Sequence, residues 1–237
     1  MIRTALALII ALVALLPSAA NASTPAHRSS DVVRLGGVAV HLRPGTRQVV
    51  TVHHTVGTDA RVSLWALRHD GWRRVLSTSR GRTGYGGLVP GSQRHQGSGT
   101  TPLGTYGLIS AFGTHRAAAT GTALPYRRIR PGDFWVEDNA SPFYNRYRNQ
   151  REGGFRWRLP LSDENGSERL SDYPVAYEDA IVLDYNQEQV RHRGAGIFLH
   201  VNGSGATAGC VSAPRRVLQQ LLHRLDPRRV PLIAIGR

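Results

Sequence analysis

Residues 195–225 read AGIFLHVNGSGATAGCVSAPRRVLQQLLHRL and decide how the rest of the chain must be arranged. The apolar run Ala195–His200 predicts a buried strand with a histidine at its exit. The next ten residues are small, polar and rich in glycine, which predicts a flexible crossing that ends at the cysteine. Ser212 is a capping residue with a proline soon after it, and apolar residues recur on one face from Val217 to Leu225. This stretch therefore predicts a strand, a loop and one substantial helix.

The rest of the chain is predicted to be mainly β structure. Asp70-Gly71 is a hairpin signal between two strand-like runs. Residues 80–104 are dense in glycine and predict a long loop. No internal repeat is present, which argues against solenoids and propellers. Strands are expected at residues 48–56, 61–67, 72–76, 105–109, 134–137, 180–185 and 230–235. The predicted fold class is mostly β, with one substantial helix after the cysteine.

The N-terminus has the features of an export signal. A short cationic start precedes the unbroken apolar run Ala5–Leu16, which is shorter than the roughly 20 residues that a membrane-spanning helix needs. Ala20-Asn21-Ala22 follows as a cleavage site of the A-x-A kind. We therefore expect residues 1–22 to be a signal peptide, residues 23–47 to hold a leader and the first strand, and the mature protein to be secreted, with no membrane segment after cleavage.

The charge of the chain favours anionic partners outside the cell. The formal net charge is +14, and all of the basic residues besides histidine are arginine. An exported cationic protein is attracted to anionic polymers of a bacterial wall. The arginines are scattered and no nucleic-acid-binding module surrounds them, so no nucleic-acid partner is expected.

Cys210 is the only cysteine in the sequence. Exported proteins usually keep cysteines in disulfide pairs, so an unpaired thiol is a buried passenger, an intermolecular bridge or a reactive group. The neighbourhood favours the reactive group, because the sulfur would lie close to the positive end of the helix dipole, which stabilises a thiolate. His200 could exchange protons with the thiol and a leaving group. The backbone N–H groups of Gly209 and Cys210 could form an oxyanion hole.

Neither a metal nor a cofactor is expected. One cysteine with one nearby histidine falls short of the ligands that zinc requires, and the other histidines lack the spacing of metal ligands.

Several motifs, in the same order, resemble the L,D-transpeptidase (YkuD) family. Ile197-Phe-Leu-His200 followed by Thr207-Ala-Gly-Cys-Val-Ser212 is similar to the family's His…[Ser/Thr]-x-Gly-Cys signature. Gly99-Thr-Thr-Pro-Leu-Gly-Thr-Tyr106 looks like the Thr-Pro-x-Gly-x-Tyr/Phe segment. Other segments resemble an exported, Gram-positive-type branch of the family. This chain departs from many members of the family, because it has Ala208 before the Gly-Cys pair and Ser212 after it.

The resemblance implies a YkuD-like mixed β-sandwich, with the catalytic domain at residues 48–237. It implies that Cys210 attacks a stem peptide of peptidoglycan at position three and that His200, oriented by a backbone carbonyl, carries the proton. A second stem would then resolve the thioester as a 3→3 crosslink. Six residues are candidates for substrate binding, although the aromatic ones are also typical core residues: Thr207, Ser212, Tyr144, Tyr185, Asn186 and Trp135.

Two other functions stay open from the sequence. An L,D-carboxypeptidase would use water instead of an amine as the acceptor. A non-catalytic basic wall-binding protein would use its arginines alone and carry an inert Cys210.

Overall fold

The computed structural model describes residues 32–237. The predicted signal peptide, residues 1–22, and the leader before Val32 lie outside this described part. No helix within the described residues is long and apolar enough to cross a membrane.

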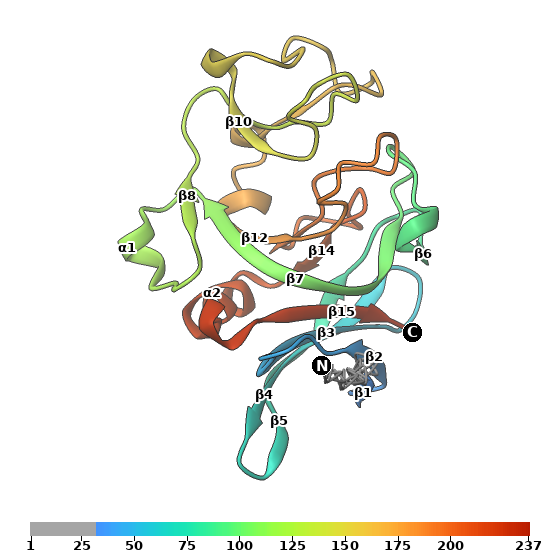
Figure 1. Cartoon of the computed structure of the whole chain (residues 1–237), viewed down its shortest axis with the longest axis vertical. Helices are drawn as coiled ribbons and strands as arrows, with labels where there is room; N and C mark the ends of the chain where they lie inside the picture. The colour runs from blue at the N-terminus through green and yellow to red at the C-terminus, as the bar shows by residue number, and fades with distance from the viewer. Residues whose placement is uncertain (1–31) are drawn as a thin grey trace, which may run out of the picture.

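One ten-stranded sheet of parallel and antiparallel pairs forms most of the molecule (Figure 1). Its strand order is β12-β13-β14-β5-β4-β3-β15-β7-β6, with β8 beside β7. The mostly-β prediction, with a mixed β-sandwich, is confirmed. The strands are β3 (Gln48–His54), β4 (Asp59–Arg68), β5 (Gly71–Arg82), β6 (Leu88–Pro90), β7 (Thr101–Gly113), β8 (Tyr126–Arg128), β12 (Asp179–Leu183), β13 (Phe198–Val201), β14 (Val211–Ala213) and β15 (Leu232–Gly236).

The long strand β7 closes this sheet on itself. Residues 104–107 pair with β15, and residues 108–113 pair with β12 at the other end of the strand order. In Figure 1 the strand is a continuous bent ribbon that joins the two sides of the molecule. The predicted hairpin at Asp70-Gly71 connects β4 to β5. The predicted loop 80–104 instead contains β6, the turn η1 (Gly91–Gln93) and the first residues of β7.

Helix α2 (Arg215–Arg224) is the predicted helix, but it begins later than its sequence signals indicated. Its apolar face is buried in the main core through Leu218, Leu221 and Leu222. Pro214 is the N-terminal cap, whereas Ser212 lies in β14 and caps nothing. Cys210 is therefore five residues before the first helical residue, too far for the helix dipole to act on its sulfur.

A hairpin of β1 (Val32–Leu35) and β2 (Val38–His41) occupies the region where a single first strand was expected. Its apolar residues share a small core with β3 and β15. The turn at Gly36-Gly37 lets His53 Nδ1 of β3 donate a hydrogen bond to Gly36 O at 2.8 Å.

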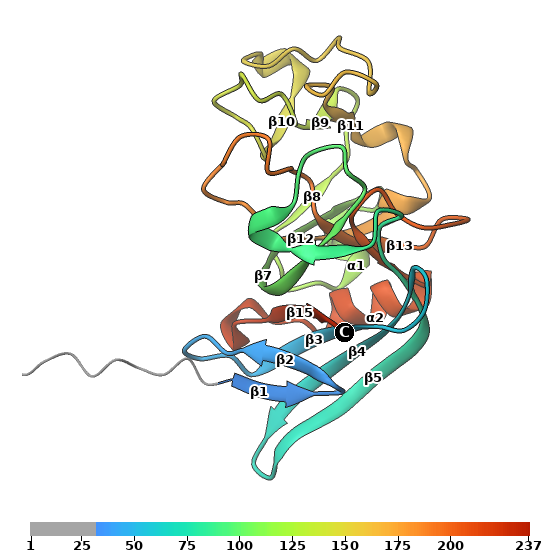
Figure 2. The same cartoon turned by 90° about the vertical axis from the view of Figure 1, so that its right-hand side faces the viewer.

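A small second sheet stands over the closed sheet, at the top of Figures 1 and 2. It arises from the segment between β8 and β12, and its order is β10-β9-β11. Because this segment reaches over β13 and β14, it supplies one wall of the cavity described below. Its elements, with the remaining short helices, are β9 (Asp133–Trp135), β10 (Tyr147–Asn149), β11 (Glu168–Arg169), α1 (Ala117–Thr120), η2 (Gln150–Glu152), η3 (Leu170–Asp172), η4 (Ala176–Glu178) and η5 (Pro227–Arg229).

Candidate active site

Cys210 lies immediately before β14 and beside the neighbouring parallel strand β13. Its side chain is 9% exposed. The S–H group donates to Gly196 O at 3.2 Å, and the sulfur accepts from Phe198 N–H at 3.3 Å. Burial, together with the nearby charge of Glu168, raises the pKa of the thiol to about 12. The predicted thiolate at a helix N-terminus is thus wrong for this resting state, in which the group is a neutral thiol.

His200 lies on β13 and is buried. Its Nδ1 is 2.8 Å from Val201 O. A carbonyl oxygen only accepts, so Nδ1 carries the proton and the neutral ring keeps a free lone pair on Nε2. Burial lowers the pKa of His200 below its usual value, despite the opposing effect of the Val201 hydrogen bond. The ring is therefore neutral at neutral pH and can accept a proton.

Both residues line one cavity of about 340 Å³. Among the described residues the sulfur forms no hydrogen bond to the imidazole, so the thiol must turn away from Gly196 before it can transfer its proton. Residues from the small second sheet and its connections form the opposite wall: Glu137, Glu168, Tyr173, Ala176 and Tyr177.

The turn that carries the cysteine is held by Thr207. Its hydroxyl donates to Cys210 O at 2.6 Å and accepts from Gly209 N–H at 3.2 Å. Thr101, from the second family-like motif, also donates to Cys210 O at 3.3 Å. Thr207 lines the cavity as predicted, but its hydroxyl is engaged in shaping this turn. The Gly209 N–H must leave Thr207 before it can bind an oxyanion.

Gly209 is required by its conformation and its neighbours. Its φ is +131°, and a Cβ there would lie 2.8 Å from both Thr100 O and Arg94 Nη2. The space on this side of Gly209 is thus filled by the protein.

Replacing Gly209 with alanine is therefore expected to lower stability by about 1–3 kcal/mol, because an L residue is strained at this φ and its methyl group meets a backbone oxygen. Thermal denaturation measures the effect. The matched control is Gly203→Ala, since a Cβ at Gly203 would meet nothing within 4 Å. Equal melting temperatures for the two variants would contradict this explanation.

Five of the six predicted substrate-binding residues lie outside the cavity, which corrects that prediction. Trp135 donates from Nε1 to Asn145 Oδ1 at 2.9 Å and stacks in an aromatic cluster. Tyr144 is fully buried and donates to Gln96 Oε1 at 2.6 Å. Trp135 on β9 and Tyr144 in the turn before β10 thus both belong to the core, as large aromatic side chains in β domains commonly do.

The other three misplaced residues are structural as well. The Tyr185 hydroxyl lies 3.0 Å from both Gly91 O and Arg193 O, either of which can accept its hydrogen bond. Asn186 holds its own loop through hydrogen bonds with Val190 and Gly194. Ser212 is buried in β14, and its Oγ has no hydrogen-bond partner among the described residues.

Sequence reasoning missed Arg94, which also lines the cavity and is 5% exposed. Its Nε donates to Thr100 O at 2.8 Å, and its Nη1 to Arg193 O at 3.3 Å. No carboxylate within residues 32–237 pairs with it. Its charge lowers the pKa of Cys210, although less than burial raises it. Arg94 is thus placed to stabilise negative charge that develops near the nucleophile.

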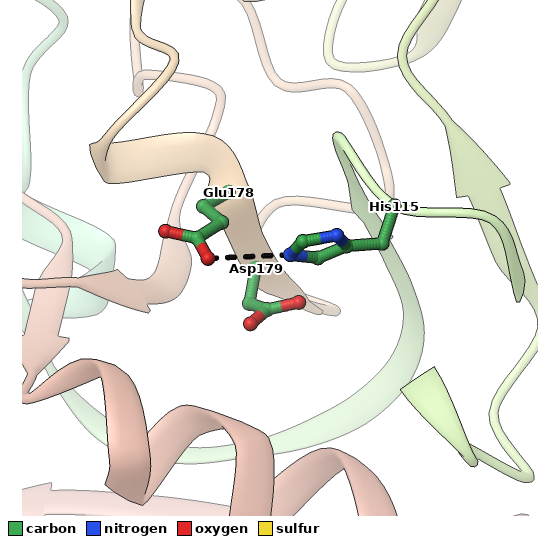
Figure 3. A group of neighbouring side chains, drawn as sticks. All are labelled: His115, Glu178 and Asp179. Carbon is green, nitrogen blue, oxygen red and sulfur yellow. Dashed lines mark hydrogen bonds and ion pairs between the residues drawn. The ribbon is translucent and has the colours of Figure 1, made fainter. Parts of the chain in front are cut away.

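A second cluster, outside this cavity, consists of His115, Glu178 and Asp179 (Figure 3). One ligand atom of each lies within 4.8 Å of the others, so the three could together hold a cation. Arg215 already donates to Glu178 Oε2 at 2.6 Å, and His115 Nε2 lies 3.2 Å from Glu178 Oε1. Asp179 Oδ2 is buried without a partner, and burial raises the pKa of this carboxyl to about 6.

Asp179→Asn is expected to raise the melting temperature above pH 6 in a buffer with EDTA. The pKa of Asp179 is higher in the folded protein than in the unfolded chain, so the carboxyl binds its proton more tightly when folded. The free energy of unfolding of the wild type should therefore fall by about 1–2 kcal/mol as the pH rises from about 4 to about 6. The variant has no carboxyl at this position and should not show this fall. Melting curves at pH 4, 6 and 8 measure this, with the exposed Asp172→Asn as control. A pH-independent difference between the variant and the wild type would contradict the assignment.

Comparison with known proteins agrees with the motifs of the site. The family model of the YkuD L,D-transpeptidase catalytic domain matches residues 52–233, a span that contains both His200 and Cys210. A search of curated protein sequences found no match. Among solved structures, Bd1075 of Bdellovibrio bacteriovorus is similar at 14% identity and a TM-score of 0.40. The alignment covers 81% of this chain and 48% of that one, so this chain spans about half the length of Bd1075.

Proposed function

The chain belongs to the L,D-transpeptidase (YkuD) family, and on this basis we propose that it forms 3→3 crosslinks in peptidoglycan through a thioester on Cys210. The observation that carries the proposal is one cavity that holds both the single thiol and a neutral imidazole with a free Nε2.

In the first half-reaction, the Cys210 thiol turns toward His200 and gives its proton to Nε2. The sulfur attacks the carbonyl carbon at position three of the donor stem. The oxyanion accepts from the N–H of Cys210, and from that of Gly209 once Thr207 releases it. Protonated His200 then donates to the leaving nitrogen, the C–N bond breaks, and D-alanine departs. A thioester remains on Cys210.

In the second half-reaction, a neutral side-chain amine of another stem attacks the thioester carbonyl. The C–S bond breaks, an amide forms, and the proton lost by the nitrogen restores the Cys210 thiol through His200. The two half-reactions together leave the enzyme unchanged.

Incubation with disaccharide-tetrapeptides, followed by mass spectrometry of the products, tests the proposal. A transpeptidase yields crosslinked dimers and free D-alanine. An L,D-carboxypeptidase yields tripeptides and D-alanine without dimers, so that outcome would replace the transferase by the hydrolase. A wall-binding protein without activity yields neither product.

We also propose that the protein acts outside the cytoplasm, where its charge of +14 attracts it to anionic wall polymers. The support is the apolar N-terminal run with its small-residue cleavage pattern. Retention on purified sacculi should fall steeply between low and high salt. Retention that does not change with salt would contradict the electrostatic part of the proposal.

A further inference from the structure

Two carboxylates, Glu137 and Glu168, line the cavity that holds the nucleophile. Glu168 lies on β11 and is paired with Trp135 of the neighbouring strand β9. Glu137 is two residues after Trp135 in the chain, so the two glutamates come from adjacent segments of the small sheet. A Cβ on Gly196 would lie 3.0 Å from Glu137 Oε1. Gly196 is also the residue whose carbonyl accepts from the Cys210 thiol. The Glu137 carboxylate therefore lies beside Gly196, the residue that is hydrogen-bonded to the Cys210 thiol.

The environment of the pair disfavours two negative charges. Burial raises the pKa of Glu137 and so does the charge of Glu168, while the charge of Arg94 acts in the opposite direction. Burial also raises the pKa of Glu168, while the hydrogen bond from the Tyr177 hydroxyl, at 2.6 Å, acts in the opposite direction. Close carboxylates in such a site cannot both stay ionised at low cost unless a cation or a proton joins them.

Neither carboxylate forms an ion pair within residues 32–237, although the charge of Arg94 reaches Glu137. The ion pairs of the described residues involve other acids, although the chain has 30 arginines. The Glu137 carboxylate also accepts no hydrogen bond from a described residue, and it is only partly buried, so it faces the cavity. Arg94, the one arginine that lines this cavity, is hydrogen-bonded to backbone carbonyls and not to either acid. Two carboxylates without a bonded cation, inside the cavity of a strongly basic protein, are suited to a cation that arrives from outside.

We propose that Glu137 and Glu168 form the subsite that binds the protonated amine of the acyl acceptor. The inference rests on the proposed function and adds to it the residues that select the second substrate. A primary ammonium offers three N–H donors and one positive charge, which two carboxylates can share. Water carries no charge and gains little from the pair.

The subsite also accounts for the proton that the amine must lose. The acceptor arrives as R–NH₃⁺ and transfers one proton to a carboxylate, whose raised pKa makes it a better base than an exposed glutamate. The neutral R–NH₂ then attacks the thioester carbonyl, and the C–S bond breaks. The second proton leaves the nitrogen through His200 to Cys210, and the glutamic acid releases its proton to solvent. Overall, R–NH₃⁺ and the acyl-enzyme give the amide, the free thiol and one proton.

The test is the partition of the acyl-enzyme between amine and water. The enzyme is acylated with a tetrapeptide donor, and dimer and tripeptide are counted over a range of acceptor concentrations. We expect Glu137→Gln and Glu168→Gln to lower the ratio of dimer to tripeptide by about 10- to 100-fold and to raise the KM for the acceptor. Glu164→Gln, an exposed carboxylate outside the cavity, is the matched control and should keep the wild-type ratio.

A second measurement uses the wild type alone, in case a variant fails to fold. An acceptor with a dimethylated side-chain amine keeps its charge but gives no stable amide, whereas the acetylated acceptor has no charge. The dimethylated acceptor should compete with the natural one, and the acetylated acceptor should compete at least tenfold less.

Three results are decisive. An unchanged partition ratio in both folded variants would overturn the inference while the proposed function stands, and so would equal competition by the two modified acceptors. A wild type that forms no acyl-enzyme would overturn the proposed function itself.

Discussion

Replacing Cys210 with alanine is expected to reduce D-alanine release from tetrapeptide stems by about three orders of magnitude or more. The sulfur is the atom that would form the thioester, and no other thiol exists in the sequence to replace it. The measurement is the initial rate of D-alanine release for the purified variant and the wild type.

The control for this prediction is the folding of the variant. Alanine removes two hydrogen bonds, to Gly196 and from Phe198, without adding volume, so a cooperative melting transition should remain. A folded Cys210→Ala variant that releases D-alanine at the wild-type rate would contradict the assignment of the nucleophile.

Replacing His200 with glutamine is expected to lower the rate of acylation by about 10²- to 10⁴-fold. The effect should be large because burial keeps the thiol protonated, with a pKa of about 12, so a base must remove its proton. Glutamine has no basic nitrogen for this step. Single-turnover acylation measures the change.

The pH dependence separates loss of the base from simple structural damage. In the wild type, acylation should fall only as the pH drops through the lowered pKa of His200, where the ring becomes protonated. In the variant, the rate should keep rising with pH across the measurable alkaline range, because the thiolate then forms without help. An identical pH profile in the two proteins would contradict the role of His200 as the base.

The helix could be predicted because its evidence is local. Leu218, Leu221 and Leu222 follow the helical period, and all three are buried. The N-terminal cap of the helix could not be predicted from the sequence. Ser212 is of a residue type that commonly caps helices, yet it lies in the short buried strand β14. The three-residue strand gives no periodic signal of its own. Because the helix begins only at Arg215, its N-terminus is too far from Cys210 to stabilise a thiolate, which is why that prediction was wrong.

The residues of the site likewise fall into those that a local sequence pattern predicts and those that only the tertiary structure brings together. Cys210 and His200 belong to neighbouring segments of the chain, and their motif predicted both. Glu137 and Glu168 come from the distant segment that folds over the sheet, and only the tertiary structure brings them to the same cavity. Tyr144 and Trp135 were predicted from segments that resemble the family, and such a resemblance does not distinguish a pocket wall from a core.

The most direct test of the account is the intact mass of the protein after incubation with a carbapenem, a β-lactam whose carbonyl a catalytic thiol can attack. We expect one covalent adduct on the wild type and none on Cys210→Ala. A wild type that remains unmodified, or an equal adduct on Cys210→Ala, would contradict the claim that Cys210 is the nucleophile of an acyl-transfer enzyme.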